Sequence, residues 1–205
     1  FCDCGYLKEI TLPKNLEFID ADAFWNCTDL KLSRSELPAS LKVINGSAFY
    51  GCKNIDRIVF PDGLEFLGGS AFGGCTGLTE INVPAGVDTA YREAGPFVDC
   101  SNLKKVTFAK GIDNVPYSIF ENCKGLETVE IPDTVKEIES YAFSGCAGLT
   151  KVNIPKNVTQ IDKDAFLKCS ALKEIQLPES LGYMGSEVFK ACTALEKITF
   201  PSLSC

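Results

Sequence analysis

The sequence predicts one β-rich solenoid, in which a short unit repeats along all 205 residues. Three observations support this fold class. A cysteine returns at intervals of 23 or 25 residues, the same apolar slots surround it each time, and a proline falls at one place in most units. A period held across a whole chain indicates stacked units that bury their apolar edges against one another. The repeating cysteines are Cys4, Cys27, Cys52, Cys75, Cys100, Cys123, Cys146, Cys169 and Cys192.

Each unit is predicted to begin with a short strand. In the unit that starts at Leu126, Val129 and Ile131 lie two residues apart, as in a strand with both side chains on one side. Pro132 ends this strand, because proline has no amide hydrogen to donate to a ladder. Parallel strands stack about 4.8 Å apart, so the eight intervals predict a solenoid roughly 40 Å long.

The second half of the unit is predicted to be more compact. The spacing from Val135 to Ile138 departs from strict alternation and indicates a turn or a short extended piece. Ala142 and Phe143 then lie in a tight corner before Cys146. The core slots of this unit and the next two are Leu126, Val129, Ile131, Val135, Ile138, Ala142, Phe143 and Cys146; Leu149, Val152, Ile154, Val158, Ile161, Ala165, Phe166 and Cys169; and Leu172, Ile175, Leu177, Leu181, Met184, Val188, Phe189 and Cys192.

The pattern L-x-x-I-x-I-P, followed by V-x-x-I and A-F-x-x-C, resembles the treponemal-type leucine-rich repeat of the BspA-like family. The resemblance covers nearly all of the chain. It implies a right-handed leucine-rich-repeat solenoid with a parallel sheet on the concave face and short strands or turns on the convex face. It also implies a secreted or surface-attached protein, often an adhesive one.

Composition narrows the classes of partner. The unbroken repeat argues for a single domain over residues 1–205, and no stretch approaches the 18 or more apolar residues of a membrane span. A net charge of −7 without a basic stripe excludes nucleic acid as an expected partner and gives no reason for direct membrane insertion. Both terminal repeats are incomplete, so we expect a fragment of a longer protein.

The eleven cysteines do not predict a metal site or a cofactor. Nine of them are about one repeat apart, and the chain contains no histidine, whereas zinc ligands cluster closely in sequence. A column of buried thiols that act as small apolar side chains is the favoured interpretation. Disulfides between stacked slots stay open as the alternative, because neighbouring Cα atoms would lie about 5 Å apart.

When the sequence is aligned to the repeat, no segment indicates a catalytic motif. The glycine-rich segment 68–74 is one copy of the Ala-Phe corner, and it lacks a phosphate-binding lysine. The absence of histidine removes Ser-His and Cys-His nucleophile pairs. We therefore expect no enzyme and no cofactor.

Two columns of apolar residues in the N-terminal third are candidate partner-binding surfaces. One column is Phe18, Val43 and Phe66, where later units carry polar residues; the other is Trp25 and Tyr50. Exposed apolar patches tend to mark interaction sites, and Trp and Tyr are common anchors. Two alternatives stay open: preceding sequence in a longer protein covers the patch, or turning loops half-bury the columns.

An insertion supplies a further candidate pair. The residues Tyr91 and Arg92 lie where one 25-residue interval exceeds the usual period, and insertions in repeats form loops on one face. They are either a contact pair or part of a tolerated loop.

These observations favour a non-enzymatic module, extracellular or at a cell surface, that recognises or adheres to a protein or a cell-surface or matrix macromolecule. The alternative is a rigid structural spacer that presents another domain at a cell surface. A spacer would tolerate substitutions at the candidate residues, and a binder would not.

Overall fold

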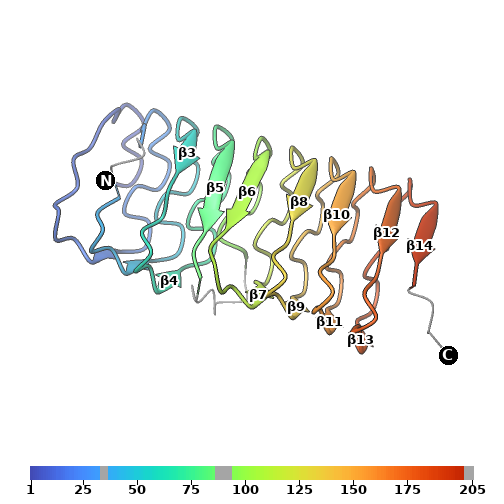
Figure 1. Cartoon of the computed structure of the whole chain (residues 1–205). Coiled ribbons are helices and arrows are strands. Elements are labelled where there is room, and N and C mark those ends of the chain that lie inside the picture. Colours follow the sequence, from blue (N-terminus) through green and yellow to red (C-terminus); the bar gives the residue numbers. More distant parts are fainter. Residues whose placement is uncertain (33–36, 86–93, 201–205) are drawn as a thin grey trace.

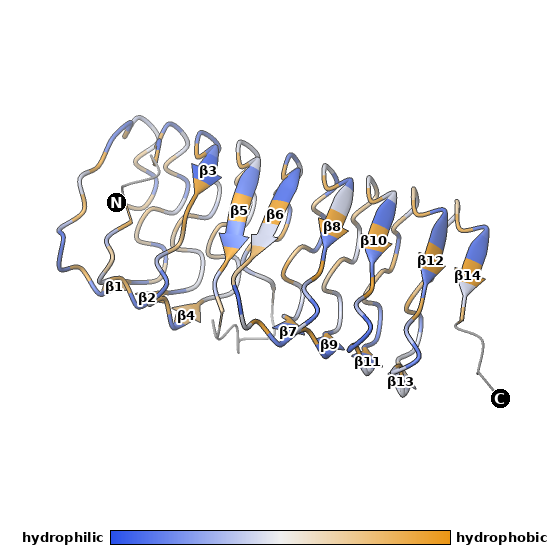
Figure 2. Ribbon diagram, viewed as in Figure 1, coloured by the Kyte–Doolittle hydropathy of each residue, from blue (hydrophilic) through white to orange (hydrophobic). Residues whose placement is uncertain are grey.

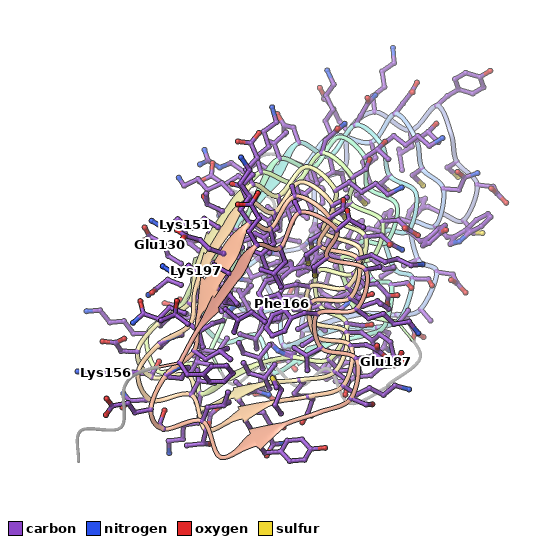
Figure 3. The ribbon with its side chains drawn as sticks, turned by 90° about the vertical axis from the view of Figure 1, so that its right-hand side faces the viewer. Glu130, Lys151, Lys156, Phe166, Glu187 and Lys197 are labelled. Atoms are coloured by element: carbon purple, nitrogen blue, oxygen red, sulfur yellow. The ribbon has the colours of Figure 1, made fainter. Side chains whose placement is uncertain are left out.

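A computed structural model describes residues 1–32, 37–85 and 94–200. The chain winds as a right-handed parallel β-solenoid, with each coil stacked on the one before it (Figure 1). No helix occurs in this described part of the chain. Each coil has three sides, which Figure 3 shows in end view: a sheet side with the longer strands, a short-strand side, and a turn side without strands.

Strands of the sheet side pair in register from coil to coil. Residue Glu80, for example, lies between Arg57 of the preceding coil and Lys105 of the following coil. The hydrogen-bonded groups are β3–β5–β6, β8–β10 and β12–β14. These strands are β3 (Arg57–Ile58), β5 (Glu80–Val83), β6 (Lys105–Phe108), β8 (Thr128–Glu130), β10 (Lys151–Asn153), β12 (Glu174–Gln176) and β14 (Lys197–Thr199).

Strands of the short-strand side have two residues each, one outward and one inward. They form the parallel groups β1–β2–β4 and β7–β9–β11–β13. They are β1 (Phe18–Ile19), β2 (Val43–Ile44), β4 (Phe66–Leu67), β7 (Asn114–Val115), β9 (Glu137–Ile138), β11 (Gln160–Ile161) and β13 (Tyr183–Met184).

The turn side is compact because two backbone positions per coil are left-handed. In the coil of Phe143 these are Tyr141, at φ 61°, and Gly145, at φ 72°. Most coils place Gly, Asn, Asp or Ser there, and Gly, Asn and Asp are the residues that tolerate this conformation best. The predicted corner at Ala142 and Phe143 is therefore confirmed as a pair of tight turns.

A continuous column of phenylalanine rings fills the core. Successive ring centroids lie 4.9–6.4 Å apart, and the rings are nearly parallel. Figure 3 shows one of them, Phe166, inside the coil. We call this the phenylalanine ladder: Phe1, Phe24, Phe49, Phe72, Phe97, Phe120, Phe143, Phe166 and Phe189.

The repeating cysteines are buried thiols from Cys27 to Cys192, as predicted, and Cys4 in the first coil is exposed. They do more than fill space. The Cys146 thiol donates a hydrogen bond of 3.1 Å to the backbone carbonyl of Phe120 in the preceding coil, and the other buried cysteines repeat this contact. Each thiol thus joins two coils at a buried carbonyl.

The predicted core slots from Leu126 to Cys169 are all buried. Hydrophobic residues recur at one level along the sheet-side arrows in Figure 2. One core assignment is wrong: Met184 is 47% exposed. In the earlier coils a following coil covers this slot, as Ile161 is covered by Met184 itself, and no described strand pairs with β13 on its other edge.

Candidate functional site

The apolar column predicted in the N-terminal coils is an in-register row. Phe18 pairs with Val43, and Val43 pairs with Phe66, on strands β1, β2 and β4. Phe18 is 59% exposed, and the other two residues are half-buried. The next residue of each strand turns inward, so the row faces outward on the short-strand side. We call it the apolar row.

Polar residues occupy the same positions in the later coils. The amide of Gln160 donates a hydrogen bond of 3.0 Å to Glu137, and the amide of Asn114 donates to Glu139. Hydrogen bonding thus replaces apolar surface from β7 onward, until Tyr183 in β13. Among the described strands of this side, β1, β2 and β4 form the one run of adjacent apolar positions, and β13 carries exposed Tyr183 at the other end.

A hollow of about 530 Å³ adjoins the apolar row at the first coil. The residues that line it include Phe1, Leu12, Leu16, Phe18 and Asp20. The Asp20 pKa is lowered, mainly because its carboxylate accepts hydrogen bonds from the Ala21 backbone amide and from the Asn45 side chain. This corner therefore combines apolar surface with a fixed negative charge.

The second predicted column lies on the turn side, apart from the apolar row. The rings of Trp25 and Tyr50 are stacked, with centroids 6.2 Å apart and planes 9° apart. Tyr50 packs against Gly73, where a Cβ atom would meet the tyrosine ring at 2.9 Å. Both aromatic residues are half-buried. The residues within each column lie next to one another, but the two columns lie on different sides of the coil.

The insertion pair Tyr91 and Arg92 lies outside the described residues, as does the segment 33–36.

The sheet face carries charges of both signs. Arg57 and Lys105 both donate to the carboxylate of Glu80 between them, the lysine at 2.8 Å. These hydrogen bonds, the one from Arg57 first, lower the Glu80 pKa to about 2. In the coils of β3, β5 and β6 the charges on this face thus pair with each other.

The chemistry of the buried thiols in the middle coils differs from that of catalytic cysteines. Burial raises the pKa of Cys52 and of Cys100 to about 12, whereas a nucleophilic cysteine needs a lowered pKa. Across residues 1–32, 37–85 and 94–200, no three His, Cys, Asp or Glu side chains are grouped in a way that could hold a metal ion. The same residues include no helix of the length and hydrophobicity that crossing a membrane requires.

Comparison with known families gives one match. The model of the BspA type leucine rich repeat region matches residues 1–94 and 93–204, with six copies. No curated protein matches the chain.

Solved structures share the fold. A leucine-rich repeat protein from Bacteroides ovatus has a TM-score of 0.76 and 27% identity, over 98% of this chain and 57% of that one. One from Eubacterium ventriosum has a TM-score of 0.67 and 21% identity, over 97% and 61%. The leucine-rich repeat protein of T. pallidum has a TM-score of 0.59 and 30% identity, over 92% and 78%. The chain thus spans about three fifths of the length of the first two proteins.

Proposed function

Because this chain belongs to the BspA-type leucine-rich repeat family, we propose that it is a non-enzymatic recognition or adhesion module. It acts outside the cell or at a cell surface, and its partner is a protein or another cell-surface or matrix macromolecule. Leucine-rich repeat solenoids build extended surfaces from stacked units, which suits recognition of a macromolecule better than enclosure of a small substrate.

The apolar row carries this proposal. Phe18, Val43 and Phe66 present apolar side chains from adjacent strands, while the same positions in the next three described strands are Asn114, Glu137 and Gln160. Stacking of the coils does not require apolar residues at this outward position, because the inward residue of each strand makes the packing contacts. Apolar surface at such a position is typical of an interface core.

The non-enzymatic part of the proposal is supported by the chemistry of the chain. The chain has no histidine. Burial raises the pKa of the Cys75 and Cys123 thiols in the middle coils well above the usual value. Glu80, a carboxylate with a strongly shifted pKa, is held ionised between two cations. A carboxylate in that state is suited to an ion pair rather than to general acid catalysis.

The test is a binding measurement with one change on the row. Purified matrix and cell-surface proteins are presented one at a time to the wild-type chain, and any that bind are measured again with Phe18→Asp. A buried anchor would lose about tenfold or more in affinity. Thr159→Asp, which adds the same charge to the short-strand side of a later coil, is the control and should bind as wild type does.

Two results would contradict the proposal. One is that neither this chain nor a longer form of the protein binds any macromolecule. The other is that Phe18→Asp lowers the stability of a longer chain and leaves its binding unchanged, since preceding coils would then cover the row.

The spacer alternative is favoured by one observation, the uninterrupted phenylalanine ladder from Phe1 to Phe189. A column of stacked rings, in coils that thiol hydrogen bonds join at backbone carbonyls, suits a stiff rod. A spacer would keep its function when Phe18, Phe66, Trp25 and Tyr50 are all replaced by polar residues, so that combined variant separates the two functions.

A further inference from the structure

A column of alternating charge runs along the corner between the sheet side and the short-strand side. In four successive coils, the residue after the proline slot is Lys110, Asp133, Lys156 and Glu179. All four residues are exposed. Figure 3 shows Lys156 at this corner, directed away from the ribbon. We call these residues the charged column.

The charged column has no ion pair within the described part of the chain. Ion pairs do form elsewhere, such as Arg57 with Glu80 on the sheet face and Lys190 with Glu187 on the turn side. None of the four described ion pairs includes a residue of the column. The four side chains are therefore exposed and not held in an ion pair within this part of the chain.

Two hollows adjoin the charged column, of about 480 and 700 Å³, and both include Asp133 and Lys156 in their walls. The wall of the smaller hollow also includes the half-buried Pro178 and the exposed amides of Asn153 and Gln176. The corner is thus recessed next to its charges, which lets side chains of a partner approach closely.

The charge order is complementary to its own reverse. Reading from Lys110 to Glu179, the signs are plus, minus, plus, minus. In an antiparallel copy, Lys110 would face Glu179 of that copy, and Asp133 would face Lys156. Each of these contacts occurs twice, which is the self-complementarity of a two-fold interface. A parallel copy would instead place like charges opposite each other.

The spacing favours a solenoid over an extended peptide. The ladder rings of these coils lie 5.2–5.7 Å apart, so the column charges repeat at about the coil spacing. Side chains on one face of an extended strand repeat at about 6.8 Å and would fall out of register over four coils. A second copy has the same spacing and can meet all four charges together.

In this antiparallel arrangement, the outward residues on either side of the charged column do not place like charges opposite each other. Toward the sheet, Glu130 would face Asn153 of the other copy, an acceptor against an amide donor. Toward the short strands, Lys136 would face Thr159. The pairings next to the centre of the interface therefore contain no like charges.

We propose that the charged column and its two hollows form a surface for self-association, on which a second copy of this chain docks antiparallel about a two-fold axis between the coils of Asp133 and Lys156. The surface is separate from the apolar row, and the proposal is independent of the function proposed above. Exposed ion pairs are individually weak and screened by salt. The dimer is accordingly weak, and it dissociates as the salt concentration rises.

Sedimentation equilibrium of the full 205-residue chain tests this, at protein concentrations up to about 10⁻⁴ M. The wild-type mass should approach that of a dimer in low salt and fall to that of a monomer in about 0.5 M NaCl. Asp133→Lys and Lys156→Glu should each be monomeric alone, because each places like charges opposite one another twice. Mixed in equal amounts, the two variants should form a heterodimer, since Lys at 133 then faces Glu at 156.

The control is Lys124→Glu, an equal charge reversal in the loop between the turn side and the sheet side, which should dimerise as wild type does. The proposal is overturned if the wild-type chain stays monomeric in low salt, if both single variants still dimerise, or if mixing them restores nothing. It is equally overturned if the variants lower the melting temperature without changing the mass, because the column would then serve only to stabilise stacking within one chain.

Discussion

Replacement of Phe143 by alanine tests the core of the solenoid directly. Phe143 is fully buried, and its ring stacks on Phe120 at 5.5 Å and on Phe166 at 5.2 Å. Truncation of a buried phenylalanine costs about 3–5 kcal/mol. Within that total, each lost ring pair contributes about 0.5–1.5 kcal/mol. We expect the upper part of the range, because both ring faces lose a neighbour.

Guanidinium titration and a thermal scan followed by circular dichroism would measure the effect. A loss of about 4 kcal/mol lowers the melting temperature of a chain this size by about 10 °C. Phe1→Ala is the matched control, since Phe1 belongs to the same ladder but is 69% exposed. Its cost should stay within about 1 kcal/mol.

Hydrogen exchange would show which coils lose stability in Phe143→Ala. In a solenoid each unit contacts only its neighbours, so amide protection should fall mainly in the coils of Phe120, Phe143 and Phe166. An unchanged denaturation midpoint for Phe143→Ala, or a loss of protection spread evenly over the chain, would refute the reasoning from the ladder.

Three further outcomes are expected. A thiol reagent should modify Cys2 and Cys4 rapidly in the folded chain and the eight buried cysteines only on unfolding; rapid reaction of all would contradict the buried column. Because the Glu80 pKa is lowered from 4.5 to about 2 on folding, its ion pairs stabilise the chain above pH 4.5 and this stabilisation is lost as the pH falls toward 2. The melting temperatures of wild type and Glu80→Gln should therefore converge in acid, and a constant difference would disprove the assignment. Lys168 is left-handed at φ 59°, so Lys168→Gly should stabilise the chain by about 0.5 kcal/mol in denaturant titration, whereas Lys168→Ala, which keeps a Cβ atom, should give no gain.

The coil could be predicted in detail from the sequence. The strand at Val129, its end before Pro132, the short extended piece at Ile138 and the corner at Phe143 all follow from local spacing, and the structure confirms them. The reason is that inward and outward positions are set within one unit and copied by the next.

Contacts between coils were harder to predict. Met184 has the sequence of a core slot, yet it is exposed, because burial depends on a following coil and not on the residue itself. The thiol of Cys146 looks like a small apolar side chain in sequence, yet it donates to the Phe120 carbonyl, an alignment that only stacking produces. Sequence reasoning also does not single out the charged column, although aligning the slots after the proline displays its alternating signs.

The candidate surfaces also depend partly on the sequence and partly on the tertiary structure. The apolar character of Phe18, Val43 and Phe66, and of Trp25 and Tyr50, is a property of the sequence and its period. Only the tertiary structure places the first group on the short-strand side and the second pair on the turn side, packed on Gly73. A repeat determines which residues of one unit turn outward, because that depends on local backbone geometry. The neighbours of an outward residue depend on how the chain bends between the three sides of a coil. They depend as well on the register between successive coils, which is fixed only when the coils stack.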